Sequence, residues 1–332
     1  MAPKPAQGKV LIWNGEREDG HLTYMYHPVV WTLREGLQAM GCNVSVGSGI
    51  QRSLHRSLNS LSLGDSFIFV GSADHNALPW DQLRKRQIRT IYYNTEPFGC
   101  LKGLGPVNVD EVWDYSWANV DRCVAAGKFR KASNTSTVLD FSKQKIIRYV
   151  PPGAIKGSPQ VVNFGKFGRG RGWTFLGRAD ASQARLGCFR TATAGLQRGR
   201  DFFETSNVWS NKTFRDLIQS SNGPSIFLSI HKNCNRAGMP FEALRGSLLL
   251  SAGVLLISER SYTKDMNEYR GMVNFAPAGR ALREAATAIT ALSADEREVR
   301  ARRANAAFQS RFSPLAIMKK ARVFDVIHPQ HQ

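Results

Sequence analysis

The chain has 332 residues, 42% of them hydrophobic, and carries 45 Lys and Arg against 26 Asp and Glu, a formal net charge of +19. This length exceeds the usual size of a single hydrophobic core, so we expect two domains. The longest apolar stretch, 248–257, is shorter than the ~20 residues that cross a membrane, and the N-terminus lacks the apolar region of a signal peptide. The charge favours polyanions, phosphorylated substrates or anionic membrane surfaces as partners.

The positive charge is densest between residues 165 and 200, where Asp180 is the single acidic residue. A solvated basic face explains this pattern, and contact with phosphate or nucleic acid explains it as well. Both interpretations stay open at this point.

The cysteines are scattered without CxxC spacing, at Cys42, Cys100, Cys123, Cys188 and Cys234. This distribution predicts reduced, mostly buried thiols in a cytosol-like compartment, and it indicates no zinc site. We therefore expect a cytoplasmic protein, with peripheral contact to a membrane as an alternative.

In the first half of the chain, short apolar runs alternate with helical patterns. Helices are expected after Pro28 and Pro79, because proline suits the first turn of a helix, and again from Ala118. The predicted strands are 9–15, 43–48, 65–72, 89–97, 109–117 and 146–153.

A second series of the same kind follows a segment that is rich in Gly, Lys and Pro. Its predicted strands are 172–178, 225–232, 254–259 and 273–277, and its predicted helices start near Ser182, span 240–253, and occupy 279–312 with a break near Ser293. Strands that alternate with helices form parallel sheets covered on both faces. The fold class is therefore α/β, with two Rossmann-like lobes and the cleft between them.

The expected domains follow from this alternation. They are an N-terminal Rossmann-like domain at 1–155, a linker at 156–171, a C-terminal Rossmann-like domain at 172–312, and a tail at 313–332 that is a candidate for packing back on the first domain.

Polar residues cluster where strands of the second lobe end, which is where such folds bind ligands. His231, Lys232 and Arg236 follow one strand, and Glu242 and Arg245 stand in the first turn of the next helix, whose N-terminus suits a diphosphate. Plainer explanations exist: Glu242 complements the helix dipole and pairs with Arg245 at i,i+3, and His231 is a hydrogen-bonded strand-end residue.

Several short motifs recur in a characteristic order. They are FLGR (175–178), LSIH (228–231), FEALR (241–245), SAGVLLISE (251–259), DMNEY (265–269) and MVNFA (272–276), after YYNTEP (92–97), VWDYSWANVD (112–121) and YVPPG (149–153). In this order they resemble GT-B glycosyltransferases of the bacterial "glycosyl transferases group 1" type, over roughly residues 9–312.

The resemblance implies a transferase that moves a hexosyl or related sugar from a UDP-, GDP- or ADP-linked donor to an acceptor hydroxyl. It implies that Glu242 holds the donor ribose hydroxyls and that Arg178 faces the diphosphate. His231 would approach the phosphates or the sugar. Ser258 and Glu259, at the next strand end, would reach the donor or simply form a polar turn.

The resemblance has departures. Many retaining members carry a second glutamate where this chain has Leu249 and Leu250, which weakens a retaining assignment. No DxD-type motif follows a strand, and GT-B enzymes generally stabilise the leaving diphosphate with basic side chains and a helix dipole. We therefore expect no essential metal and no cofactor besides the donor substrate.

An inverting enzyme also needs a general base near the acceptor hydroxyl. The loop after the first strand offers Glu16, Asp19, His21 and His27, and the NTEP turn offers Glu96. His21 and Glu96 are the leading candidates. Asp114 and Asn119 are candidates for shaping the cleft, with helix capping as the plainer role of Asn119.

The net charge leaves a different class of function open. A DNA-directed glycosyltransferase, or a non-catalytic nucleic-acid-binding protein on a GT-B-like scaffold, would gain affinity from phosphate contacts. A basic surface that docks on an anionic membrane, to reach a lipid or glycan acceptor, is a third possibility. Fold alone does not decide among them.

Overall fold

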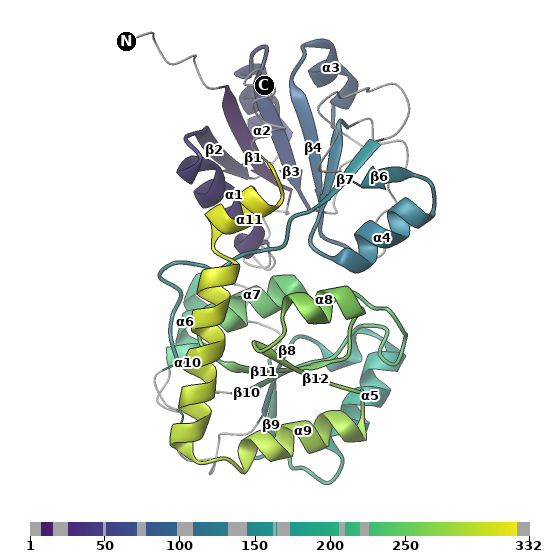
Figure 1. The fold of residues 1–332 in the computed structure, drawn as a ribbon, viewed down its shortest axis with the longest axis vertical. Coiled ribbons are helices and arrows are strands. Elements are labelled where there is room, and N and C mark those ends of the chain that lie inside the picture. The colour runs from purple at the N-terminus through teal and green to yellow at the C-terminus, as the bar shows by residue number, and fades with distance from the viewer. Residues whose placement is uncertain are drawn as a thin grey trace. The chain divides into compact units, whose positions relative to one another are not determined.

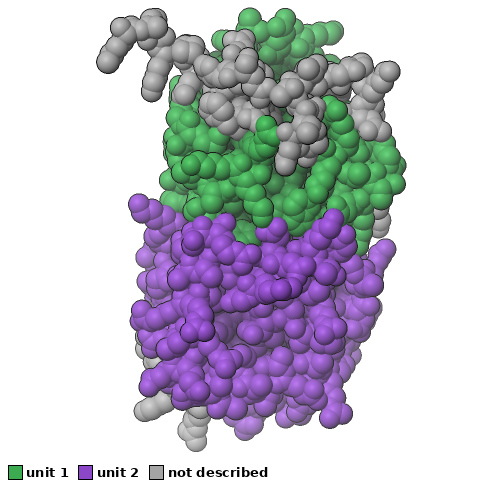
Figure 2. Space-filling view, in the orientation of Figure 1, with its two compact units in different colours: residues 1–153, 312–332 green, residues 154–311 purple. Residues whose placement is uncertain are grey.

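The computed structural model describes residues 8–15, 26–48, 51–71, 78–97, 109–131, 145–161, 164, 173–205, 210–219 and 226–323. The chain divides into two compact units, which Figure 2 colours separately: Met1–Gly153 with Phe312–Gln332, and Ala154–Arg311. The segment proposed as a linker is counted with the second unit. There the backbone amide of Val161 donates to the carbonyl of Ala252, and the Gln160 side chain donates to the carbonyl of Ser251.

The first unit contains a parallel sheet in the order β2-β1-β3-β4-β5-β7-β6 (Figure 1). Strands β3 and β4 are almost entirely buried, as expected for central strands covered on both faces. The bounds of the strands are β1 Lys9–Asn14, β2 Asn43–Ser48, β3 Ser66–Val70, β4 Arg89–Asn94, β5 Glu111–Asp114, β6 Phe129–Lys131 and β7 Lys145–Tyr149.

The helices of the first unit include one from the end of the chain. They are α1 His27–Ala39, α2 Gln51–Asn59, α3 Trp80–Lys85, α4 Trp117–Ala125 and α11 Pro314–Lys320. Helix α11 packs against α1 at Gly36, where a Cβ atom would lie 2.4 Å from Cγ of Met318. In addition, Arg148 of β7 donates to the carbonyl of Ala321 at 2.6 Å. The C-terminal segment is therefore part of the first unit's fold.

A buried ion cluster also lies in this unit. Glu111, whose side chain has no exposure, accepts from Arg89 at 3.2 Å and from Arg148 at 3.1 Å. Its second oxygen also accepts from the indole N–H of Trp113 at 2.9 Å. Both carboxylate oxygens of Glu111 therefore accept hydrogen bonds, as a buried charge requires.

The second unit contains a parallel sheet in the order β12-β11-β10-β8-β9 (Figure 1). Its strands are β8 Trp173–Leu176, β9 Phe202–Thr205, β10 Ile226–Ser229, β11 Leu255–Glu259 and β12 Val273–Ala276. Its helices are the short η2 Ala179–Ala181, α5 Gln183–Thr193, α6 Asn211–Gln219, α7 Ala243–Ser251, α8 Thr263–Glu268, α9 Arg280–Thr290 and α10 Ala294–Arg311. The apolar run of α7 is buried, and the helix stops before Gly253, which adopts a φ of 72°.

Each strand and helix predicted from the sequence has a counterpart in the structure, with shifted ends. The predicted strand 109–117 stops at Asp114, because Ser116 caps α4. The helix predicted from Pro240 begins at Ala243. Seven elements were not expected from the sequence, namely α2, β6, η2, β9, α6, α8 and α11. The strands among them have only three and four residues, too few for a clear alternation.

The expectation of reduced thiols is wrong for three of the described cysteines, because Cys123, Cys188 and Cys234 are disulfide-bonded. Cys188 of α5 and Cys234, in the loop after β10, form a disulfide with a Cα–Cα distance of 6.5 Å. Their positions are 46 residues apart, so no local spacing signals the pair. Cys42 is buried and is not part of a disulfide. Among the described helices, none combines the length and the apolar character needed to cross a membrane.

Candidate functional site

The order of strands in the second unit defines where a ligand is expected. Strand β8 is flanked by β9 on one side and by β10 on the other, so the winding of the sheet reverses at β8. Open α/β sheets bind ligands outside the carboxyl ends of their strands at such a switch point. The turn at Gly177 and Arg178 follows β8, and the loop that starts at Ile230 follows β10. Both therefore lie at the expected position.

Two arginines bind the carboxylate of Glu242, the residue immediately before α7. Nη2 of Arg185, from α5, lies 2.9 Å from Oε1, and Nη1 of Arg245, from α7, lies 2.5 Å from Oε2. The predicted i,i+3 pair is thus confirmed, and Arg185 adds a second cation. Both guanidinium groups lie beside the ring of Phe175, at 5.7 Å and 5.8 Å from its centroid.

The backbone of the β8 turn approaches the same cluster. A Cβ atom on Gly177, whose φ is 141°, would lie 3.2 Å from Nη2 of Arg245. A non-glycine residue there would be strained in its backbone and crowded against the guanidinium group. The FLGR motif thus places a glycine where the turn and Arg245 meet.

The cluster carries a net positive charge. Burial acts to raise the pKa of Glu242, but Arg245 and Arg185 outweigh it and hold that pKa below its ordinary value, so the carboxylate is ionised at neutral pH. For Arg245, burial is the main cause that lowers the pKa from its ordinary value. Within the described part of the chain, the Nε atoms of both arginines are buried without a hydrogen-bond partner. Two cations against one carboxylate leave capacity for an additional anion.

His231 is fully buried at the end of β10. Its Nε2 lies 3.1 Å from the hydroxyl of Ser261, while its Nδ1 has no hydrogen-bond partner among the described residues. Its plainer role as a hydrogen-bonded strand-end residue therefore accounts for one ring nitrogen and leaves the other unused.

Glu259 and Ser258 are occupied by internal contacts. The Glu259 carboxylate accepts from the backbone amides of His231 at 3.0 Å and Asn235 at 2.7 Å, so it holds the loop after β10. The hydroxyl of Ser258, which is fully buried, donates to the carbonyl of Glu259 at 3.0 Å. Glu259 therefore acts on the loop that carries the other candidates, and Ser258 hydrogen-bonds the backbone of Glu259.

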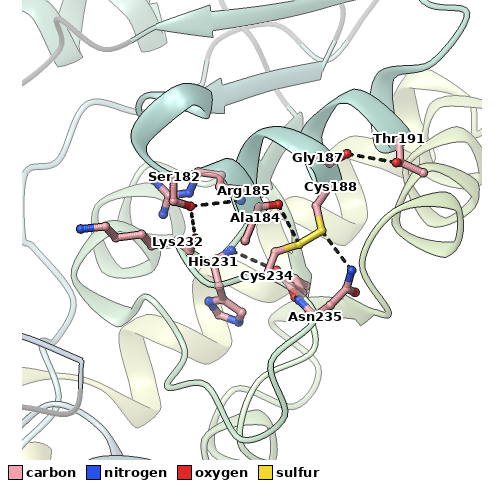
Figure 3. Close-up of a disulfide and its surroundings, with 11 residues drawn as sticks. Ser182, Ala184, Arg185, Gly187, Cys188, Thr191, His231, Lys232, Cys234 and Asn235 are labelled. Atoms are coloured by element: carbon pink, nitrogen blue, oxygen red, sulfur yellow. Dashed lines mark hydrogen bonds between the residues drawn. A yellow bond between two sulfur atoms is a disulfide. The ribbon is translucent and has the colours of Figure 1, made fainter.

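Figure 3 shows how the same loop is tied to α5. The Cys188–Cys234 disulfide joins the two segments, and the hydroxyl of Ser182 donates to the carbonyl of Lys232 while it accepts from the amide of Arg185. The loop that follows His231 is therefore fixed at both the start and the middle of α5.

The remaining basic candidates are exposed. Lys232 and Arg236 lie on the surface of the loop. The side chain of Arg178 is 69% exposed and pairs with Asp180 at 3.1 Å. An exposed pair of this kind contributes little to stability, so Arg178 can exchange Asp180 for a ligand at small cost.

In the first unit, Glu96 is the second residue after the end of β4 and is exposed. The side chain of Asn119 donates to the carbonyl of Glu96 at 3.1 Å and to Asp114 at 3.1 Å. The expected capping role of Asn119 is wrong, because Ser116 caps α4 by accepting from the amide of Ala118 at 3.0 Å. His21, the other candidate base, lies outside the described residues, as do Glu16 and Asp19.

Sequence reasoning missed Arg185, Ser261 and the structural role of Asp114. Arg185 is separated from Glu242 by 57 positions, so only the fold brings the two together. The one local signal is Ser182, a helix N-cap that places Arg185 in the first turn of α5. Across the described part of the chain, no group of three or more His, Cys, Asp or Glu side chains is arranged to hold a metal ion.

Comparisons of the sequence with protein-family models and with curated proteins find no match. Solved structures do match over nearly the whole chain. HepE of Anabaena, in complex with UDP and glucose, aligns with a TM-score of 0.57 and 10% identity over 96% of this chain and 100% of its own. Apo OtsA aligns with a TM-score of 0.58 and 9% identity, over 97% of this chain and 99% of its own.

A third match is BGT of phage T4 in complex with UDP-glucose, with a TM-score of 0.52 and 12% identity over 96% of this chain and 99% of its own. Identities this low establish a fold and nothing finer. The predicted fold class is confirmed: the chain has the GT-B fold, and its two units are Rossmann-like α/β lobes.

Proposed function

We propose that this chain is a glycosyltransferase that transfers a sugar from a nucleotide-sugar donor to an acceptor hydroxyl. The observation that carries the proposal is the cluster of Arg185, Glu242 and Arg245 at the switch point of the second unit. Solved structures of the same fold, HepE and phage T4 BGT, hold UDP-glucose, which supports a UDP-, GDP- or ADP-linked donor for this chain as well.

The residues of the cluster suit the two polar parts of such a donor. Arg245 supplies positive charge for the diphosphate. Further positive charge comes from three residues that follow β8 and β10, namely Arg178, Lys232 and Arg236. The ionised carboxylate of Glu242 retains lone pairs beyond its two arginine contacts, and these accept hydrogen bonds from the ribose hydroxyls. The unused Nδ1 of His231 is a further polar group for the phosphates or the sugar.

The chemical step needs no group beyond the chain and its two substrates. A general base, Glu96 or His21, removes the proton from the acceptor hydroxyl as the oxygen forms a bond to the anomeric carbon. The bond from that carbon to the diphosphate oxygen breaks, and the leaving diphosphate takes the electron pair. The arginines stabilise the charge that develops on it. We propose metal-independent transfer on this basis.

The test of the donor site is a thermal shift with UDP, GDP, ADP and their sugars. We expect one nucleotide family to raise the melting temperature of the wild type, because ligand that binds the folded state stabilises it. Glu242→Ala should abolish that shift, since two buried arginines lose their counter-ion and the ribose loses its acceptor. Donor hydrolysis across the same nucleotide sugars then reports activity without a known acceptor.

The matched control is Glu284→Ala, in an exposed pair with Arg280 in the same unit. It should leave the shift intact, because that carboxylate lies on the surface of α9. A melting curve that no nucleotide or nucleotide sugar moves would sink the proposal.

The acceptor defines a second candidate, which the net charge of +19 favours. In this version the acceptor, or the bound partner of a non-catalytic protein, is nucleic acid. In a third version of the proposal, a basic surface of the protein binds an anionic membrane, and the acceptor is a glycan or lipid at that membrane. A cytoplasmic location is likewise only a proposal. The Cys188–Cys234 disulfide argues against it, because reducing compartments disfavour disulfides.

A further inference from the structure

A buried polar network lies beneath Glu96 at the carboxyl edge of the first sheet. Asn94 ends β4 and Asp114 ends β5, and the two residues are direct partners in the sheet register. Nδ2 of Asn94 donates to Oδ2 of Asp114 at 2.6 Å, and Nδ2 of Asn119, from α4, donates to Oδ1 at 3.1 Å. All three side chains are buried to within 1% exposure.

The network converges on the backbone of Glu96. The carbonyl of Glu96 accepts from Nδ2 of Asn94 at 2.9 Å and from Nδ2 of Asn119 at 3.1 Å. The amide of Glu96 donates to Oδ1 of Asn94 at 3.2 Å. Three hydrogen bonds from buried side chains thus fix the peptide groups on both sides of the Glu96 Cα atom, while the residue itself is exposed.

Fold maintenance does not account for this arrangement. The N-terminus of α4 is already capped by Ser116, and Oδ1 of Asp114 accepts from the amide of Ser116 at 2.9 Å. Asn119 is therefore not needed as a cap. Burying two amides and a carboxylate is costly unless every group is satisfied, and apolar side chains would pack the strand ends at lower cost. The neighbouring hydroxyl of Thr95, 7% exposed, has no hydrogen-bond partner among the described residues.

We infer that Asn94, Asp114 and Asn119 are positioning residues that hold Glu96 as the general base for the acceptor hydroxyl. The inference rests on the proposed function and assigns the base to Glu96 instead of His21. The Glu96 carboxylate takes the hydroxyl proton while the oxygen bonds to the anomeric carbon and the diphosphate leaves with the electron pair. A general base must stay within hydrogen-bond reach of the proton that it removes. When its backbone is fixed, only the rotamers of its side chain still vary.

The test is a double-mutant cycle on hydrolysis of UDP-glucose, GDP-mannose and ADP-glucose, in which water takes the place of the acceptor hydroxyl. Glu96→Gln should lower kcat by about 10²-fold or more. Asn119→Ser should lower kcat by roughly tenfold and leave KM for the donor unchanged, because donor contacts lie in the other unit. In the Glu96→Gln background, Asn119→Ser should have no further effect, since residues that act as one unit are not additive.

Ser116→Ala is the matched control for damage to this segment. It removes the α4 cap and should lower the melting temperature, while kcat stays close to that of the wild type. If Asn119→Ser fails to fold, Asn94→Ser, which removes the amide without burying a second carboxylate beside Asp114, replaces it in the cycle.

The outcomes separate the two ideas. Full activity of Glu96→Gln or of Asn119→Ser, or losses that add in the double variant, would overturn the positioning network and leave the proposed transfer intact. Absence of hydrolysis by the wild type together with absence of any nucleotide-induced thermal shift would overturn both. A nucleotide shift that persists in every variant of the cycle is expected, because the donor contacts do not include this network.

Discussion

At the scale of single residues, Glu111 determines part of the response of the protein to acid. Burial acts to raise the pKa of Glu111, but Arg148 and Arg89 outweigh burial and bring it below the ordinary value of 4.5. A carboxylate whose folded pKa lies below its unfolded pKa stabilises the folded state above the unfolded value and loses that contribution as pH falls through the folded value. Stability from Glu111 is therefore complete at neutral pH and declines only below about pH 4.5.

Glu111→Gln should lower the free energy of unfolding by about 3–5 kcal/mol at pH 7, because two half-buried arginines lose their fully buried counter-ion. The difference from the wild type should shrink as pH falls below 4.5 through the lowered pKa of the native Glu111 carboxylate. Urea unfolding at pH 7 and at a series of lower pH values measures both quantities. Glu284→Gln, in an exposed i,i+4 pair, should change the free energy by no more than about 0.5 kcal/mol, and a Glu111→Gln effect equally small would contradict the assigned role.

Local spacing explains which site residues the sequence predicts. Glu242 and Arg245 are one helical turn apart, and their ion pair is confirmed. Arg185 binds the same carboxylate from 57 positions away, and Asn119 reaches Glu96 across 23 positions. Contacts of this kind are created by the packing of strands against helices, and no short-range pattern encodes them.

At the scale of elements, the loop after β10 depends on tertiary contacts for its conformation. The amides of His231 and Asn235 are held by Glu259, and Cys234 is bonded to α5. A disulfide that closes a 46-residue separation stabilises a fold mainly by restricting the unfolded chain. The loop carries Lys232 and Arg236, so its order also bears on the proposed diphosphate contacts.

Replacing both Cys188 and Cys234 with Ala should lower the free energy of unfolding by about 2–4 kcal/mol. It should also weaken nucleotide binding. Without the disulfide the loop becomes ordered only when the nucleotide binds, and this ordering costs binding free energy. Urea unfolding and nucleotide titration measure the two effects. A thiol reductant should remove the stability difference between the wild type and the double variant; a difference that persists under reduction would show that lost packing, and not the lost bond, is its cause.

The alternation of strands and helices is the part of the fold that periodicity predicts best. Long apolar runs such as that of α7 and the buried strands β3 and β4 have clear patterns, and all have the predicted type. The short strands β6 and β9 are edge strands of three and four residues, and neighbouring strands define them more than their own sequence does. Polar helix patterns such as α2 were likewise overlooked.

At the scale of the whole molecule, several of the basic side chains that stand out in the sequence are paired with carboxylates. In the basic stretch 165–200, Arg185 is buried against Glu242, and Arg178, Arg198 and Arg200 each pair with a carboxylate. Exposed pairs contribute little to stability, so Arg178, Arg198 and Arg200 stay available to an anionic partner, whereas Arg185 is committed to Glu242.

If nucleic acid is the acceptor, duplex DNA should bind in a gel shift at 50 mM salt and lose at least about 10³-fold in affinity by 200 mM, as six or more phosphate contacts require. Reversing three exposed basic residues of α10, Arg300, Arg302 and Arg303, to Glu gives a charge-reduced variant for comparison. No binding at any salt concentration would exclude the nucleic-acid version. Sedimentation with acidic liposomes then tests the membrane version by the same logic.

The return of α11 to α1 has a consequence for how the molecule is made. The first unit is complete only when residues 312–323 have joined it, and these are synthesised after the entire second unit. A growing chain therefore carries α1 without its partner helix α11 until the second unit has been synthesised. For the same reason the gene cannot be cut once to yield both lobes intact: a fragment that ends at Gly153 lacks the last helix of its own fold.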